Sequence, residues 1–126
     1  MFSFQGIVGR GNERGKRLGF PTANIPLLQQ VPEGIYLSRV RHDGMTHNAL
    51  TFIGSAKTYG ETNYQSETHI LNFDRDLYGQ NLSITLLKKI RDNEAFTTEY
   101  ALIQQMEIDK KEAEEYFKSI NTTYAN

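Results

Sequence analysis

Two neighbouring runs of strand-forming residues constrain the fold of this chain more than any other feature. The runs cover residues 35–42 and 45–54, and Asp43-Gly44 joins them. This dipeptide readily adopts the two positive φ angles of a type I′ turn, so the pattern predicts a β-hairpin. The fold must therefore contain an antiparallel sheet.

Similar segments elsewhere predict further strands. Apolar residues alternate loosely or form short runs over residues 2–8, 66–73 and 81–90, with Gly, Asn and Asp punctuating the connections. Another extended stretch is flanked by Pro26 and Pro32, and we expect it to pack without full ladder pairing. The first two thirds of the chain therefore read as β-structure.

In the C-terminal third of the chain, apolar residues recur with a different spacing. Apolar side chains recur at helical spacing over residues 98–106, and the segment from Asp109 to Glu112 has the pattern of a cap for a last helix. Strands followed by helices, with no alternation of the two, are typical of an antiparallel β core with helices at one end. We therefore expect a mainly β fold with two C-terminal helices.

Length and composition limit the possible classes of protein. With 126 residues, 38% of them hydrophobic, we expect one domain over residues 1–126. A net charge of −1 offers no general attraction to nucleic acid or to an anionic membrane, and we expect neither partner. The absence of cysteine excludes disulfides and thiolate metal sites, and no apolar run is long enough for a membrane-spanning helix. We expect a cytoplasmic monomer.

A basic, glycine-rich segment at residues 10–24 is the strongest functional signal. It holds three glycines and four cationic side chains, which suit a polyphosphate because backbone N–H groups and cations can share its negative oxygens. The spacing matches neither the Walker loop nor the dinucleotide fingerprint. On glycine and charge alone, a solvated surface connection without a ligand is an equal alternative.

The end of this segment favours a ligand. Thr22 and Asn24 are two residues apart, so in an extended backbone both side chains point to one side. Each offers a neutral oxygen of the kind that binds a hard cation such as Mg²⁺.

Three stretches of the chain resemble the sequence signatures of riboflavin kinases. They are Gly11-x-x-x-Gly15-Lys16-x-Leu18-Gly19-Phe20-Pro21-Thr22-Ala23-Asn24, then Glu67-Thr68-His69-Ile70-Leu71-Asn72-Phe73-Asp74 with Asp76-Leu77-Tyr78-Gly79, and last Ile90-Arg91 with Phe96 and Leu102. The resemblance covers nearly the whole chain. It implies a riboflavin kinase domain, built as a six-stranded antiparallel Greek-key barrel with C-terminal helices packed outside.

The resemblance also implies an activity and the residues that perform it. The activity is ATP-dependent phosphorylation of the ribityl 5′-hydroxyl of riboflavin to give FMN, with Mg²⁺ as cofactor. The implied roles are ATP binding for Gly11, Gly15, Lys16, Gly19, Thr22 and Asn24, metal binding for Thr22 and Asn24, general-base catalysis for Glu67, and flavin binding for Glu67, Thr68, Arg91 and Phe96.

Glu67 can also be judged from its own position. On a strand over residues 66–73 it shares one face with His69, Leu71 and Phe73, so a carboxylate lies beside large apolar side chains. Partial burial raises a carboxyl pKa toward the range of a general base. The alternative is a solvated or lysine-paired glutamate at the rim of the strand.

For the other candidate side chains, the sequence allows two roles each. His69 either orients Glu67 or the substrate, or is structural, and we expect no zinc site because its spacing to the other histidines is not that of metal ligands. Arg91 either binds the flavin, as the resemblance implies, or pairs with Asp92 or Glu94. The aromatic residues near loops either stack on an isoalloxazine ring or form the edge of the core; they are Tyr59, Tyr64, Tyr78 and Phe96.

The chain departs from the family pattern at two places. The segment from Ala56 to Tyr59 and residue Asn93 differ from the usual residues, so we expect contacts to the flavin edge that differ from those of the family. Two other functions compete with the kinase: a non-catalytic flavin- or nucleotide-binding barrel, and an RNA-binding barrel, for which the aromatic-basic interleaving is missing. We expect either a stand-alone kinase or the C-terminal part of a bifunctional enzyme.

Overall fold

The computed structural model describes residues 2–11, 14–27, 29–55 and 64–124, and side chains only as far as residue 120 in the last helix. Its six strands and two helices are β1 (Ser3–Ile7), α1 (Arg14–Arg17), β2 (Ala23–Ile25), β3 (Gly34–His42), β4 (Met45–Gly54), β5 (Gln65–Ile70), β6 (Asn81–Arg91) and α2 (Glu99–Tyr124).

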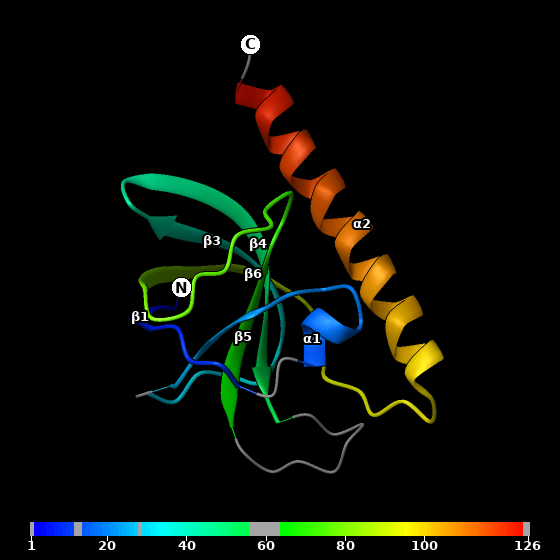
Figure 1. Cartoon of the computed structure of the whole chain (residues 1–126). Helices are drawn as coiled ribbons and strands as arrows, with labels where there is room; N and C mark the ends of the chain where they lie inside the picture. The colour runs from blue at the N-terminus through cyan, green and yellow to red at the C-terminus, as the bar shows by residue number, and fades with distance from the viewer. Residues whose placement is uncertain (1, 12–13, 28, 56–63, 125–126) are drawn as a thin grey trace.

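The strands form one antiparallel sheet that curls into a nearly closed barrel (Figure 1). The strand order is β1-β6-β3-β4-β5-β2, in which β6 returns to lie beside β3 of the β3-β4-β5 meander. That arrangement is the Greek key. The two edge strands approach each other at an isolated bridge, where the amide of Gly9 donates to the carbonyl of Asn24 at 2.8 Å. The expected fold class is confirmed.

The predicted hairpin is also confirmed. Asp43 and Gly44 have φ angles of 50° and 75°, and the strands pair from His42–Met45 to Gly34–Ile53. Positive φ at both turn positions matches the right-handed twist of the two strands, which a turn of opposite sign would splay apart.

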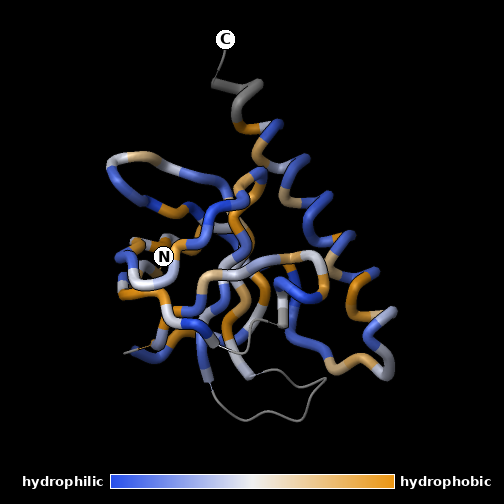
Figure 2. Tube along the Cα trace, in the orientation of Figure 1, coloured by the Kyte–Doolittle hydropathy of each residue, from blue (hydrophilic) through white to orange (hydrophobic). Residues whose placement is uncertain are grey.

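Side chains of the sheet build two apolar layers. One fills the barrel and includes Val40, Ile53 and Leu82, each fully buried. The other lies on the outer face of the sheet, where Ala113 and Phe117 of α2 pack against residues of β3 and β4. Polar and apolar segments alternate along α2, as expected for a helix with one face on the barrel (Figure 2).

The prediction of two C-terminal helices is wrong in one respect. α2 is continuous, and Thr98 caps it by accepting a hydrogen bond from the amide of Ala101 at 3.1 Å. Asp109, expected to cap a second helix, lies inside α2 and is buried. Its buried carboxylate is held by an arginine of the barrel, which the local sequence pattern does not reveal.

One further element differs from expectation: the basic segment, whose glycines favour a loop, contains the single helical turn α1. The stretch between Pro26 and Pro32 agrees with the prediction that it packs without full ladder pairing. β2 pairs with β5 over three residues, and this ladder ends at Ile25, one residue before the first proline.

β5 ends at Ile70, earlier than predicted, because Asn72 adopts a left-handed conformation with φ 53°. The regular alternation of side chains between the two faces of the sheet is interrupted at Asn72. Leu71 packs in the outer layer, whereas Phe73 packs against the barrel interior. The expectation that Phe73 shares a face with Glu67 is therefore wrong.

Candidate functional site

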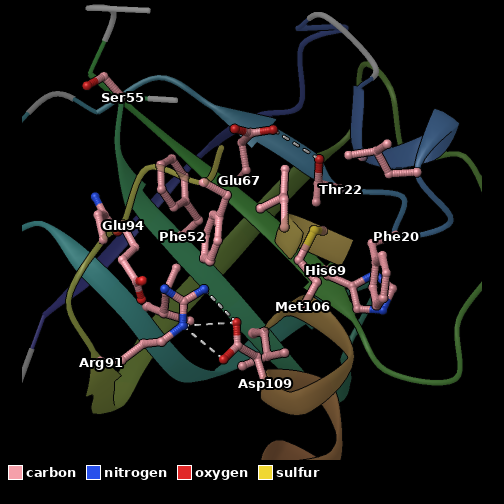
Figure 3. A pocket seen from close by; sticks show the side chains of 17 residues that line it. Phe20, Thr22, Phe52, Ser55, Glu67, His69, Arg91, Glu94, Met106 and Asp109 are labelled. Atoms are coloured by element: carbon pink, nitrogen blue, oxygen red, sulfur yellow. Dashed lines mark hydrogen bonds and ion pairs between the residues drawn. The ribbon is translucent and has the colours of Figure 1, made fainter. Parts of the chain in front are cut away.

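A cavity of about 160 Å³ lies between the outer face of the barrel and the N-terminal half of α2 (Figure 3). The glycine-rich segment closes one side, and the segment that follows β6 closes another. Apolar side chains make up about half of the lining. The lining residues are Gly15, Leu18, Phe20, Thr22, Ile35, Leu50, Phe52, Ser55, Glu67, His69, Arg91, Asn93, Glu94, Phe96, Leu102, Met106 and Asp109. We call this space the apolar cavity.

Glu67 places its carboxylate at the edge of the apolar cavity. Its Oε1 accepts a hydrogen bond from the hydroxyl of Thr22 at 3.3 Å, and its Oε2 accepts one from the side-chain Nε2 of Gln65 at 3.1 Å. Figure 3 shows the Thr22 and Glu67 side chains pointing toward each other. The β2–β5 ladder brings them together, because it sets Asn24 opposite Glu67 and Thr22 just before the first paired residue.

A second cavity, of about 190 Å³, lies on the other side of the glycine-rich segment. Its wall carries three cations, Arg10, Lys16 and Arg75, and two carboxylates, Asp74 and Asp76. Cations outnumber carboxylates here, whereas carboxylates outnumber cations in the apolar cavity, so an anion fits this cavity better. Asp76 holds Arg10 by an ion pair at 3.1 Å. The amide of Tyr78 and the guanidinium of Arg10 lower the pKa of Asp76, so its carboxylate stays charged at neutral pH. We call this space the cationic cavity.

Thr22 lines both cavities. It has this position because the chain passes very close to itself at Gly15: a Cβ there would meet the carbonyl oxygen of Phe20 at 2.4 Å. Only glycine permits that approach without a shift of the backbone. The apolar cavity with its carboxylate and the cationic cavity therefore meet at one hydroxyl.

Asn24 lies behind this junction, 7% exposed. A Cβ on Gly11, whose φ is 57°, would meet the Asn24 side chain at 2.4 Å, so the glycine leaves room for the amide. Within the described part of the chain, the Oδ1 of Asn24 has no hydrogen-bond partner. An unpartnered carboxamide oxygen near the Thr22 hydroxyl and the Glu67 carboxylate fits a hard cation that prefers oxygen ligands.

Arg91 does line the apolar cavity, but its guanidinium is held by Asp109 of α2. Nε and Nη2 donate to the Asp109 carboxylate at 2.9 and 2.7 Å, and the side chains are 19% and 6% exposed (Figure 3). Pairing with Asp92 or Glu94 was the alternative to flavin binding that the sequence left open; the backbone carbonyl of Asp92 accepts a hydrogen bond from Nη1 of Arg91 at 3.1 Å. Sequence reasoning missed Asp109 because its helical pattern suggested a cap.

Thr68 lies on the opposite face of β5 from Glu67. Its hydroxyl is buried in the barrel and bonds to that of Thr51 at 2.8 Å, which in turn bonds to Ser38 at 2.7 Å. Thr68 lines the cationic cavity and is not among the residues that line the apolar one, so its position does not favour the flavin binding that the resemblance implies.

Three further residues were expected in the site. Phe96 lines the apolar cavity and Lys16 the cationic one. Gly19, with φ 92°, is not among the residues that line either cavity and has open space where a Cβ would lie. Asn93 lines the apolar cavity and donates to the carbonyl of Ile53 at 3.0 Å. Tyr59 and the rest of residues 56–63 lie outside the described residues.

His69 is brought to the apolar cavity beside Glu67. Its Nδ1 donates to the carbonyl of Pro21 at 2.8 Å, and its ring stands edge-on to Phe20, with centroids 5.6 Å apart. Burial, aided by the nearby charge of Lys110, lowers the pKa of His69 more than the Pro21 carbonyl raises it. The histidine is therefore neutral at pH 7.

A protein-family profile described as "Flavokinase: Riboflavin kinase" matches residues 1–117. This match includes both cavities and all but the last turns of α2. The chain belongs to the flavokinase family.

Individual relatives agree with this membership. The trifunctional protein RibF/MnmA of Mycoplasmoides gallisepticum is 38% identical over 92% of this chain and 18% of its own length. The bifunctional riboflavin kinase/FMN adenylyltransferase of Bacillus subtilis is 32% identical over 94% of this chain and 40% of its own length. The chain thus spans less than half of the curated relatives that it matches.

A solved structure gives the same fold. The riboflavin kinase from Trypanosoma brucei superposes with a TM-score of 0.63 at 23% identity, covering 92% of this chain and 79% of that one. Within the described residues, no helix is both long enough and apolar enough to span a membrane. No three His, Asp or Glu side chains of that same part gather as a metal site.

Proposed function

We propose that this flavokinase domain transfers the γ-phosphoryl group of ATP to the ribityl 5′-hydroxyl of riboflavin, giving FMN and ADP. The observation that carries the proposal is the position of Thr22. It stands between an apolar cavity that suits a flavin and a cationic cavity that suits a triphosphate, with the Glu67 carboxylate 3.3 Å away.

The apolar cavity would hold riboflavin between the barrel and α2. Phe52, Phe96 and Met106 offer faces against which a planar ring can pack. The ribityl chain would then extend toward Glu67, the carboxylate at the cavity edge. Glu67 thereby serves both as flavin-binding and as catalytic residue.

The cationic cavity would hold the phosphates of ATP. Lys16 lies on its wall. Gly11 and Gly15 let the segment pack closely against Asn24 and Phe20, and the backbone N–H groups of this segment would donate to the phosphate oxygens. Gly19 permits the left-handed backbone that returns the chain from α1 to Thr22. Phosphoryl transfer asks the protein mainly for such positioning and charge neutralisation.

In the transfer, the ribityl oxygen forms a bond to the γ-phosphorus as the bond from that phosphorus to the ADP oxygen breaks. The hydroxyl proton passes to an oxygen of Glu67. Bound Mg²⁺, held by Thr22 and Asn24, would neutralise phosphate charge and fix the phosphates in place. A positioned base of this kind contributes roughly 10²–10⁴-fold to the rate.

The decisive experiment is Glu67→Gln, which keeps the shape of the side chain and removes its basicity. We expect kcat to fall roughly 10²–10⁴-fold, or about 3–5 kcal/mol, while affinities for riboflavin and Mg-ATP change little. FMN formation is followed by chromatography. Glu112→Gln, on the exposed face of α2, is the matched control.

The possible outcomes separate the candidate functions. Wild-type protein that binds riboflavin and Mg-ATP but forms no FMN would be a binding barrel and not a kinase. A Glu67→Gln variant with normal turnover would show that Glu67 is not the base. The kinase assignment would then rest on the cationic cavity alone.

A binding experiment tests the metal site separately. Thr22→Ala and Asn24→Ala should each weaken Mg-dependent ADP binding by at least about tenfold, as expected for the loss of one ligand with charge-assisted contacts. Calorimetry with and without Mg²⁺ measures this. Unchanged Mg-ADP affinity in both variants would contradict the metal assignment.

A further inference from the structure

We infer that His69 is a positioning residue for the proposed phosphoryl transfer: by holding the Pro21 carbonyl, it keeps the Thr22 hydroxyl beside Glu67 and at the junction of the two cavities. The inference rests on the proposed function for its catalytic meaning. The geometry on which it stands does not depend on that function.

The hydrogen bond fixes the chemical form of the histidine. A carbonyl oxygen can only accept, so the 2.8 Å contact between Nδ1 and the Pro21 oxygen requires a hydrogen on Nδ1. With its pKa lowered, the ring carries only that hydrogen. Its Nε2 is buried and has no partner among the described residues.

A hydrogen bond to the Pro21 carbonyl fixes the position of the next residue, Thr22. The ladder between β2 and β5 begins at Ala23–Thr68, so Pro21 and Thr22 precede its paired residues. Because a peptide unit is planar, holding the Pro21 oxygen also fixes the direction of the Thr22 amide and the position of its Cα. The Thr22 hydroxyl then has a defined place relative to Glu67.

His69 is itself well placed to act as a fixed point. It stands two residues from Glu67 on β5, opposite Leu50 of β4, so both side chains leave one face of the same strand. Phe20 packs against its ring, which limits the ring's rotation. The strand β5 thus carries Glu67 directly and holds Thr22 through His69, so the distance between the proposed base and Thr22 is fixed by one rigid element.

Three substitutions of His69 separate the roles of its two nitrogens. Asparagine can keep a donor near the place of Nδ1, glutamine moves its polar atoms toward the place of Nε2, and phenylalanine keeps a ring with neither. For each variant we would measure kcat, the riboflavin and ATP constants, Mg-ADP affinity by calorimetry and the melting temperature. His47→Asn, the same chemical change on the neighbouring strand, is the control.

We expect His69→Phe and His69→Gln to lower kcat and Mg-ADP affinity by about tenfold each, the effect of losing one well-placed hydrogen bond. Riboflavin affinity should change less than about threefold, and His69→Asn should recover most of the loss. A purely structural role would lower the melting temperature of all three variants without this division between constants or this rescue.

Three results would overturn the inference. One is normal kcat and Mg-ADP affinity in His69→Phe. Another is rescue by glutamine in place of asparagine, which would assign the effect to Nε2 and the substrate. The third is a long-range ¹H–¹⁵N spectrum of the wild-type protein that shows His69 protonated on Nε2 at pH 7.

The proposed function and the inference fail in distinguishable ways. Wild-type protein without kinase activity would remove the kinase proposal, whereas the Mg-ADP affinities and the histidine spectrum would still decide whether His69 positions Thr22. Active wild-type protein with an equally active His69→Phe variant would remove the inference alone.

Discussion

Replacing Asp109 by alanine should destabilise the fold far more than any other single charge removal on α2. The carboxylate lies against the barrel, 6% exposed, and accepts hydrogen bonds from both Arg91 and Gln105. Alanine would leave the guanidinium of Arg91 partly buried without its counter-charge. It would also release the N-terminal half of α2 from β6.

The size of the effect follows from burial. Removing one partner of a buried ion pair costs about 3–5 kcal/mol. The Arg91 side chain is 19% exposed and keeps a bond to the carbonyl of Asp92, so the lower end of this range applies, about 3 kcal/mol. A domain of this size is stable by only about 5–15 kcal/mol, so a drop in melting temperature of roughly 10 °C is expected.

The assay is a double-mutant cycle in urea and by thermal unfolding. Asp109→Ala is measured first for the size of the effect. Asp109→Leu and Arg91→Met are then measured alone and together, because a buried pair replaced by apolar residues of similar volume is often nearly neutral. We expect each single change to be severe and the double variant to recover most of the stability. Glu112→Ala, an exposed carboxylate on the same helix, should change the free energy of unfolding by less than about 0.5 kcal/mol.

Additive costs would refute this reasoning. If the two single changes summed to the double, the ion pair would contribute nothing beyond packing. Single changes below about 1 kcal/mol, the usual limit for exposed pairs, would show that the pair behaves as a surface contact.

Three further predictions concern other parts of the molecule. Gly15→Ala should abolish Mg-nucleotide binding, because its Cβ would meet the Phe20 carbonyl at 2.4 Å, whereas Gly9→Ala, with 4.0 Å of clearance, should be tolerated in a calorimetric assay. Thr51→Val should cost about 1–3 kcal/mol in urea unfolding, because it deprives two buried hydroxyls of a shared partner; equal stability would argue that those hydroxyls find other partners. The pKa of His69 is lower in the folded protein than in the unfolded chain, so the unfolded chain binds a proton first as the pH falls below about 6.5. The free energy of unfolding of the wild-type protein should therefore decline more steeply in that range than that of His69→Asn. Parallel curves of stability against pH would contradict the burial of the ring.

Sequence alone was sufficient for the β-hairpin, for most of the strands and for the composition of the basic, glycine-rich segment. The hairpin at Asp43-Gly44 was predictable because its turn depends on two adjacent residues and on their intrinsic φ preferences. Gly11 and Gly15 could be proposed as site residues because a dense run of glycines and cations is visible in one short stretch. The change from a period of two to a helical period likewise fixed the order of strands and helix.

Other features depended on contacts between distant residues. Asp109 reads as a helix cap in its own segment, and only the packing of α2 on the barrel makes it the partner of Arg91, 18 residues away. Strand alternation puts Thr68 and Glu67 on opposite faces, but only the barrel decides that the face of Thr68 is the interior one, where its hydroxyl bonds to that of Thr51 on β4.

The junction at Thr22 is the clearest case of a feature set by the tertiary structure. The sequence shows that Thr22 and Glu67 carry oxygens, but they are 45 residues apart and their approach to 3.3 Å requires the β2–β5 ladder. His69 has its role for the same reason, since the Pro21 carbonyl that fixes its tautomer belongs to another part of the chain. Residue types and local conformations follow from short-range preferences, whereas the geometry of a site depends on long-range pairing that encloses its side chains and excludes water from them.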